Sequence, residues 1–183
     1  QGLSLGDSSL INAKNYFRSN DNSDGIILDF SALRIEEKIT ADIIIGRDAS
    51  YKSTVGFYHV KDDIGTITID GIDYTPSHSD YASLAISSSN LFDELTGLNA
   101  NLGVAEHRQA SEFDRETGKL APFALVNENI FFSFKDANID NINHFYIHGA
   151  NIIGLEDLPY GGDTDFDDTL LGFKFESRVI QSV

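Results

Sequence analysis

The chain has 183 residues, which is close to the size of one domain and long enough to bury a sizeable core. Its 13 Lys and Arg residues are outnumbered by 29 Asp and Glu residues, giving a formal net charge of −16. This charge argues against binding to nucleic acid or to anionic lipid, because both attract basic residues. With 41% hydrophobic residues the chain is too apolar for a disordered acidic tail, so the acidic residues must lie on a folded domain.

Cysteine is absent, which excludes a disulfide framework, a thiolate metal site and a cysteine nucleophile. A secreted domain without disulfides must gain its stability from its core or from a bound metal. The sequence starts with Gln1 rather than with a methionine or a signal-like segment. We therefore expect residues 1–183 to be a single domain of a larger protein. The longest apolar runs, such as Ile43–Ile45, are too short for membrane insertion, and we expect the isolated domain to be monomeric.

Short apolar segments bounded by Gly, Asn, Asp and Ser predict about ten β-strands. Several, such as Leu171–Phe175, alternate with period two, which is typical of a strand with one buried face. We expect a mainly all-β fold, resembling a β-sandwich or jelly roll, with one short helix and long loops. The predicted strands are Ile26–Phe30, Ile43–Ile45, Val55–Val60, Thr66–Ile72, Phe123–Val126, Ile130–Phe134, His144–His148, Asn151–Leu155, Leu170–Phe175 and Arg178–Val183.

Two segments differ from this strand pattern. Tyr81–Leu95 places Tyr81, Leu84 and Leu91 near helical spacing after Ser79-Asp80, which predicts a short helix between the sheets. Ala105–Gly118 is the most polar segment, and we expect it to be a long surface loop that connects two strands.

The acidic residues are concentrated near the C-terminus. Residues 136–173 hold eight Asp and Glu residues and no Lys or Arg. Such a run repels itself unless a cation binds, and Ca²⁺ takes six to eight oxygen ligands. Gly161-Gly162 lets the backbone turn sharply, so the acidic residues before and after it can face one ion, and Tyr160, Gly161, Gly162 and Asp163 can border a ligand. The predicted ligands are Glu156, Asp157, Asp163, Asp165, Asp167 and Asp168. The alternative is a solvated acidic turn without an ion.

The spacing Asp163, Asp165, Asp167 is that of the first ligands of an EF-hand loop. The Gly and Glu that an EF-hand requires at its sixth and twelfth positions are replaced by Asp168 and Lys174, so the run is not an EF-hand. Phe166 is the apolar residue within the run, and we expect it to anchor the loop to the core.

The run Leu155-Glu-Asp-Leu-Pro-Tyr-Gly-Gly-Asp-Thr-Asp-Phe-Asp-Asp168 resembles the signature of a bacterial family known as domain of unknown function 4114. Asp167 stands where that pattern has Asn, which keeps an oxygen ligand. Similar text at Val55–Thr66, Ser79–Ala85 and Leu120–Val126 extends the resemblance to roughly residues 41–177. Such domains occur in large secreted or surface proteins, often beside calcium-binding repeats of the repeats-in-toxin type. The resemblance implies calcium binding and an extracellular setting, and it names no activity.

Two further loops have alternating oxygen-bearing side chains that could bind additional calcium ions, so we expect more than one ion. One contains Asp136, Asn138 and Asp140, and the other contains Asn20, Asn22 and Asp24. Asn and Asp also favour turns for purely local reasons, so ordinary turns are the alternative for both.

Enzyme activity is not expected. The chain has no Gly-x-Ser-x-Gly elbow and no glycine-rich phosphate loop, and a carboxylate that binds calcium cannot transfer protons. His144 and His148 have the spacing of zinc ligands on a helix, but they read as strand residues that share a face with Tyr146.

The sequence therefore predicts a calcium-dependent ligand-binding module that serves adhesion, in a bacterial cell-surface or secreted protein. We expect a peptide or protein ligand rather than a glycan, since the chain has seven Tyr and no Trp. The alternatives are a lectin-like module, a structural spacer rigidified by calcium, and a hydrolase that uses Ala105–Gly118.

Overall fold

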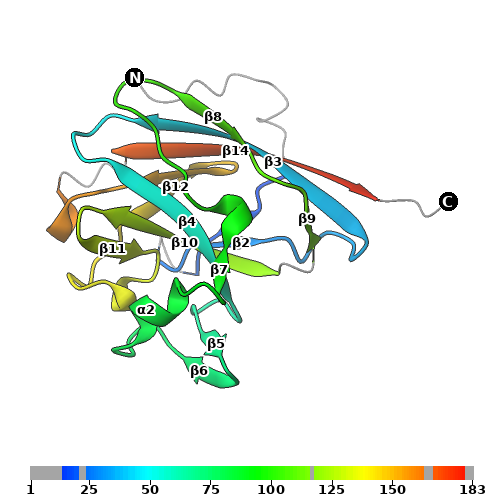
Figure 1. The fold of residues 1–183 in the computed structure, drawn as a ribbon, viewed down its shortest axis with the longest axis horizontal. Helices are drawn as coiled ribbons and strands as arrows, with labels where there is room; N and C mark the ends of the chain where they lie inside the picture. The colour runs from blue at the N-terminus through cyan, green and yellow to red at the C-terminus, as the bar shows by residue number, and fades with distance from the viewer. Residues whose placement is uncertain (1–13, 21–23, 116–117, 163–166, 180–183) are drawn as a thin grey trace.

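The computed structural model describes residues 14–20, 24–115, 118–162 and 167–179, and these form two antiparallel sheets that enclose the main core (Figure 1). The predicted mainly β, sandwich-like fold is confirmed. The first sheet has the order β1-β2-β10-β4-β7, and β11 also pairs with β10. Its strands are β1 (Phe17–Arg18), β2 (Ile27–Asp29), β4 (Ser53–Val60), β7 (Leu91–Phe92), β10 (Lys119–Val126) and β11 (Asn129–Phe132).

The second sheet has the order β12-β13-β14-β3-β8, and β9 also pairs with β3. Its centre is the ladder between β3 and β14, two strands of 11 residues that pair from Arg47–Thr169 to Glu37–Val179. The strands of this sheet are β3 (Glu37–Arg47), β8 (Glu106–Gln109), β9 (Phe113–Asp114), β12 (Phe145–Gly149), β13 (Ile152–Leu155) and β14 (Thr169–Val179).

The main core lies between the two sheets and follows from the alternation of side chains along each strand. In β3 the alternate residues Ile39, Ala41, Ile43 and Ile45 are buried, while Asp42 is exposed. Aromatic rings join the two layers, for example Phe57 of β4 against Phe173 of β14, with ring centroids 5.8 Å apart. Burial of this apolar surface provides the main driving force for folding.

A smaller core covers the outer face of the first sheet. The hairpin of β5 (Ile67–Ile69) and β6 (Ile72–Tyr74) and the helix α2 (Tyr81–Ala85) pack there (Figure 1). The Tyr58 and Tyr81 hydroxyls are 2.9 Å apart in this core, and the Tyr81 hydroxyl donates to the Gly65 carbonyl oxygen at 2.6 Å. Because both of its faces are covered, β4 is almost entirely buried and does not alternate in the way that β3 does.

The predicted helix over Tyr81–Leu95 is too long. Helix α2 ends at Ala85, and the chain continues through turns into β7 and the short 3-10 helix η1 (Asp93–Leu95). The polar run before β7 ends the helix, because the Ser87 hydroxyl donates to the Leu84 carbonyl and the Asn90 amide donates to the Ala85 carbonyl. Leu91, which fitted the helical spacing, pairs instead with Tyr58 of β4.

Two other expectations are also corrected. Ala105–Gly118 is not only a surface loop, because it contains β8 and β9, which pair along β3 through main-chain hydrogen bonds that polar side chains do not prevent. Thr66–Ile72 is not one strand, because Asp70 and Gly71 both have positive φ and form the tight turn between β5 and β6.

Among the residues that the structure describes, none of the helices has the length and apolar character needed to cross a bilayer.

Candidate metal centre

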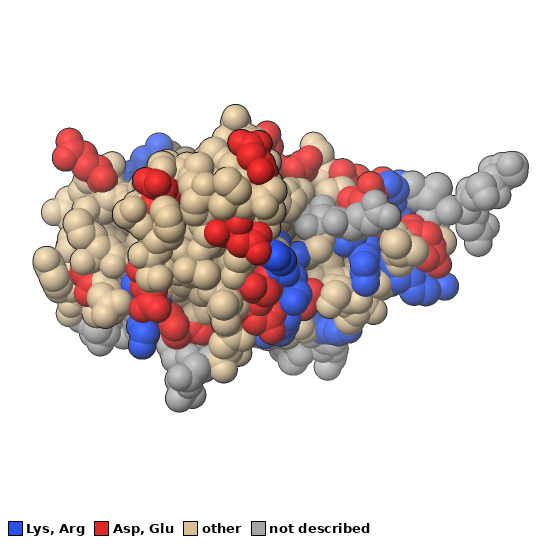
Figure 2. Space-filling model, turned by 90° about the horizontal axis from the view of Figure 1, so that it is seen from below, with Lys and Arg blue, Asp and Glu red and all other residues tan. Residues whose placement is uncertain are grey.

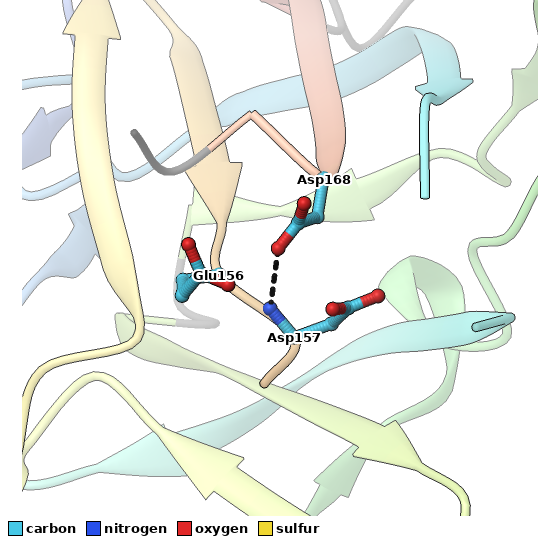
Figure 3. Close-up of side chains that lie close together, drawn as sticks. All are labelled: Glu156, Asp157 and Asp168. Atoms are coloured by element: carbon cyan, nitrogen blue, oxygen red, sulfur yellow. Dashed lines mark hydrogen bonds between the residues drawn. The ribbon is translucent and has the colours of Figure 1, made fainter. Parts of the chain in front are cut away.

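Three carboxylates meet where β13 ends and β14 begins. These strands are antiparallel neighbours, and their last pair is Leu155 with Thr169. Glu156 and Asp157 directly follow β13, and Asp168 directly precedes β14, so all three come to the same end of the second sheet (Figure 3). The sheet topology therefore brings together residues that are 11 or 12 positions apart in the sequence.

The geometry of this carboxylate triad (Glu156, Asp157 and Asp168) suits a cation. Each residue offers a carboxylate oxygen that lies within 4.8 Å of those of the other two. Glu156 and Asp157 are only 1% and 2% exposed, and Asp168 is half-buried. The Asp157 backbone N–H donates to Asp168 Oδ2 at 2.9 Å, which fixes the two acidic residues against each other (Figure 3).

The Asp157 carboxylate is poorly compensated in this site. Its burial, reinforced by the neighbouring Asp168 charge, raises the pKa of Asp157 to about 7, although the charge of Arg47 acts in the opposite direction. Asp157 Oδ2 is buried and accepts no hydrogen bond from the residues that the structure describes. A buried polar oxygen without a donor is rare in proteins, and a cation would satisfy it.

Two other buried polar atoms near the triad lack hydrogen-bond partners among the described residues. They are Thr169 Oγ1 and Arg47 Nε, which belong to residues paired across β14 and β3. β3 also reaches the triad through its C-terminal end, because the Asp48 N–H donates to the Asp168 carbonyl oxygen at 3.0 Å. Thr169 directly follows Asp168 in the sequence, at the start of β14.

Several charges elsewhere in the described part of the molecule are compensated by direct ion pairs. Arg18 binds Asp29 at 2.8 Å and Asp63 at 2.7 Å, and Lys119 also binds Asp63 at 3.1 Å. These contacts lower the pKa of Asp63 to about 2, with the Arg18 hydrogen bond as the largest cause. Figure 2 shows basic side chains directly among acidic ones in the centre and right of that face. Neither Asp157 nor Asp168 forms a salt bridge with a described residue.

The turn after β13 holds the predicted ligand-binding residues that the structure describes. The 3-10 helix η4 (Pro159–Gly161) contains Tyr160, which has a positive φ of 62° and an 81% exposed side chain. Gly162 also has a positive φ, of 45°, and a Cβ atom there would lie 2.6 Å from Glu156 Oε1. Glycine is favoured here by the positive φ, and any other residue would also displace the Glu156 carboxylate.

Of the other residues predicted for this site, the structure describes only Asp167. Asp167 is exposed and does not belong to the triad. Asp163, Asp165 and Phe166 lie outside the described residues. Metal binding by all of these acidic residues stays a prediction.

In the predicted calcium loop at residues 136–141, here called the 136–141 connection, Asn138 and Asp140 form hydrogen bonds with other residues of the protein. Asp136 is exposed in the 3-10 helix η3 (Lys135–Ala137), whereas Asn138 is buried. The Asn138 amide accepts from Phe132 N at 2.7 Å and donates to the carbonyls of Phe132 and Ile142, both at 2.9 Å. Asp140 is bonded to His144 rather than to Asp136 or Asn138.

In the predicted calcium loop at residues 20–24, the two described side chains, Asn20 and Asp24, are bonded to different parts of the chain. Asn20 donates to the Asp63 carbonyl oxygen, and Asp24 Oδ1 accepts from Lys135 N at 3.0 Å. Asn22 lies outside the described residues.

The expected face shared by His144, Tyr146 and His148 is only partly right. Tyr146 and His148 are both exposed on β12, with ring centroids 5.3 Å apart. His144 precedes the strand and is fully buried. Sequence reasoning thus missed His144, as well as Arg47 and Thr169, as neighbours of the triad. The position of Thr169 directly after an acidic run was the one available signal.

Comparison with known proteins gives one family-model match, which covers the part of the chain that contains the triad. Searches of curated proteins and of solved structures found no match. Residues 92–176 match the family model described as Domain of unknown function (DUF4114), a narrower range than the resemblance at 41–177. This match supports the predicted family name, and the matched residues include Glu156, Asp157 and Asp168.

Proposed function

We propose that this domain binds calcium through Glu156, Asp157 and Asp168. The observation that carries the proposal is the buried Asp157 carboxylate, which lies beside two other carboxylates and has an oxygen without a hydrogen-bond donor. A bound divalent cation would supply the missing partner and remove the repulsion between Asp157 and Asp168. Burial of this group without compensation would destabilise the fold.

The chemistry of the donors favours calcium over transition metals. All three side chains provide hard carboxylate oxygens, which suit Ca²⁺ and Mg²⁺. No cysteine exists in the chain, and no histidine belongs to the triad, so the softer ligands preferred by zinc and copper are missing. Calcium accepts irregular oxygen geometries, whereas magnesium demands a near-ideal octahedron and usually keeps several waters.

We further propose that the calcium-loaded domain binds a peptide or protein ligand and serves adhesion on the surface of a bacterium. Support comes from Tyr160 and Leu158, whose side chains are 81% and 39% exposed in the turn that carries the triad. An exposed aromatic ring on a turn held by a metal ion is a rigid contact residue, and tyrosine is enriched in binding interfaces. Calcium concentrations outside cells are high enough to fill sites of modest affinity.

One observation favours a second candidate, a calcium-rigidified spacer without a ligand. Glu156 and Asp157 are almost fully buried, so an ion held by them leaves few coordination positions for an external ligand. In that case the ion would serve to join the end of β13 to the start of β14. A glycan ligand remains an alternative outcome of the binding test.

Calcium titration by calorimetry tests the metal site directly. We expect the wild-type protein to bind calcium and Asp157→Asn to bind it at least about tenfold more weakly, because it loses a charged ligand. Glu128→Gln is the matched control, since Glu128 is exposed in the turn between β10 and β11 and its replacement removes the same charge. Absence of binding heat for the wild-type protein in millimolar calcium would refute the proposal.

A second measurement separates the binding module from the spacer. Peptide and glycan arrays are probed with the wild-type domain and with Tyr160→Ser, each in calcium and in EDTA. A ligand that binds only in calcium, and that Tyr160→Ser loses while keeping its calcium affinity, would support the binding module. Folded, calcium-loaded protein that binds nothing on either array would support the spacer.

A further inference from the structure

Asp140 and His144 form a buried pair next to the carboxylate triad. Both side chains are 0% exposed, and His144 Nε2 lies 2.7 Å from Asp140 Oδ2. The imidazole ring stacks on Phe131 of β11, with ring centroids 3.7 Å apart and planes 14° from parallel. The stacking and the contact with Asp140 together hold the His144 ring in one orientation.

This pair is bonded to the backbone of the acidic loop, residues 156–168, at two places. His144 Nδ1 lies 2.7 Å from the Glu156 carbonyl oxygen, and the Glu156 N–H donates to the His144 carbonyl at 2.9 Å. Asp140 Oδ2 also accepts from the Tyr160 N–H at 3.0 Å. The two contacts hold the chain on both sides of Asp157.

The hydrogen-bonding roles in this pair are largely determined by their partners. The Glu156 carbonyl oxygen can only accept, so His144 Nδ1 is the donor in that contact. Burial acts to raise the pKa of Asp140, but the hydrogen bonds from Tyr160 N and His144 outweigh it and lower that pKa. Asp140 is therefore a carboxylate that already has donors, unlike Asp157.

We propose that Asp140 and His144 are positioning residues for the calcium site and do not themselves bind the ion. They hold the backbone of Glu156 and Tyr160 in place, so that the Glu156 and Asp157 carboxylates stay close to Asp168 before calcium arrives. The proposal rests on the proposed function, since it assigns the pair a role in calcium affinity. It also gives Asp140, predicted as a ligand of a separate ion, a role at the 156–168 site.

The physical reason is preorganisation. Neighbouring carboxylates repel each other, and without a restraint the chain around them would relax to separate the charges. Residues that orient metal ligands through hydrogen bonds typically contribute a factor of about 10 to 100 in metal affinity. Here the restraint acts on the backbone of a ligand residue and on the turn that follows it.

Calcium affinity measured by calorimetry on three single variants tests this role. Asp140→Asn and His144→Gln each disturb the pair, and we expect each to weaken calcium binding about tenfold. Asp136→Asn is the matched control. It also removes one negative charge from residues 136–141, but at an exposed position. Circular dichroism in saturating calcium establishes that each variant is folded. Equal affinities for Asp140→Asn and Asp136→Asn would overturn the proposal, since general charge would then explain any change.

Two further readouts separate positioning from a loss of stability. His144→Asn places an amide N–H near the position of Nδ1, and we expect it to recover part of the affinity that His144→Ala loses. The calcium affinity of the double variant Asp140→Asn/His144→Gln should equal that of the more impaired single variant, because both residues act through one pair. Additive losses, or no recovery with His144→Asn, would show that the two residues act separately or only through stability.

The same experiment distinguishes this proposal from the proposed function. If wild-type protein binds no calcium, the proposed function fails. If wild-type protein binds calcium and Asp157→Asn does not, while Asp140→Asn and His144→Gln bind as tightly as wild type, only the positioning role fails.

Discussion

The connection 136–141 and the acidic loop 156–168 look similar in the sequence but differ in how their polar atoms are satisfied. In the connection, the Asn138 amide and the Asp140 carboxylate have donors or acceptors from the protein itself. In the described part of the acidic loop, Asp157 has a buried oxygen without a donor. A count of Asp and Asn residues therefore does not identify a metal site. The useful criterion is whether the folded chain already supplies each oxygen with a partner.

Asn138→Ala tests the internally bonded side of this comparison and should have the largest effect. It removes three hydrogen bonds and leaves buried main-chain groups of Phe132 without partners, so we expect a loss of about 3 kcal/mol in the free energy of unfolding. Chemical denaturation should give the same loss in calcium and in EDTA. Ile139→Ala, at an 88% exposed neighbour, is the control. A loss that occurs only in calcium would instead make Asn138 a metal ligand.

Asp157→Asn tests the acidic loop. The sign of its effect on the free energy of unfolding should depend on calcium. In EDTA we expect the variant to be at least as stable as wild type, because the amide removes the repulsion with Asp168. In calcium at 100 times the dissociation constant, wild type gains about 2.7 kcal/mol from binding, and the variant should lose most of that gain. Denaturation curves under both conditions measure the difference. A variant that is equally destabilised in both would show that Asp157 has a purely structural role.

The pH dependence of the calcium-free protein sharpens the same contrast. The pKa of Asp157 is raised to about 7 in the folded protein, so folding favours its protonated form. That contribution is complete below the unfolded pKa near 4 and is lost as the pH rises through 7. In EDTA the melting temperature should therefore fall as the pH rises from 5 to 8. Asp157→Asn should remove this slope, and a slope that persists would assign it to another group.

Asp136→Asn should have the smallest effect. Asp136 is exposed, and its replacement leaves the Asp140–His144 contact in place. We expect its stability to remain within about 0.5 kcal/mol of wild type, with unchanged calcium affinity at the triad. Thermal melting and calorimetry measure both quantities. A clear loss of a second calcium-binding event in this variant would restore the prediction of a separate ion at residues 136–141.

Much of the fold could be predicted because the core strands carry their own pattern. The alternation in Leu171–Phe175 marks β14, and Val55–Val60 marks β4. β8 was not predictable in this way, because it is an exposed strand held by its main-chain pairing with β3, and pairing leaves no side-chain pattern. The early end of α2 was not predicted, because the helical spacing of Leu91 outweighed the serines after Ala85, which compete with the helix for backbone hydrogen bonds.

The candidate site was predictable as far as it is local. Glu156, Asp157 and Asp168 flank two strands that pair as neighbours, so a single run of sequence contains all of the triad. Arg47 could not be assigned from the sequence, because it reaches the triad only through the pairing of β3 with β14. The role of His144 was also hidden, because its partners Asp140 and Glu156 become neighbours only when the second sheet forms.

The tight contact at Gly162 has a consequence for sequence variation. A side chain at this position would meet Glu156 Oε1 at 2.6 Å and would also need a backbone conformation, φ +45°, that residues other than glycine rarely adopt. In saturation mutagenesis scored by calcium-dependent protease resistance, replacements at position 162 should therefore lower resistance more than replacements at Tyr160. Tyr160, although its φ is also positive, already carries a side chain that points into solvent, and it should accept Asn or Gly. Among related sequences, a glycine at this point would then indicate a retained cation site more reliably than the number of acidic residues around it.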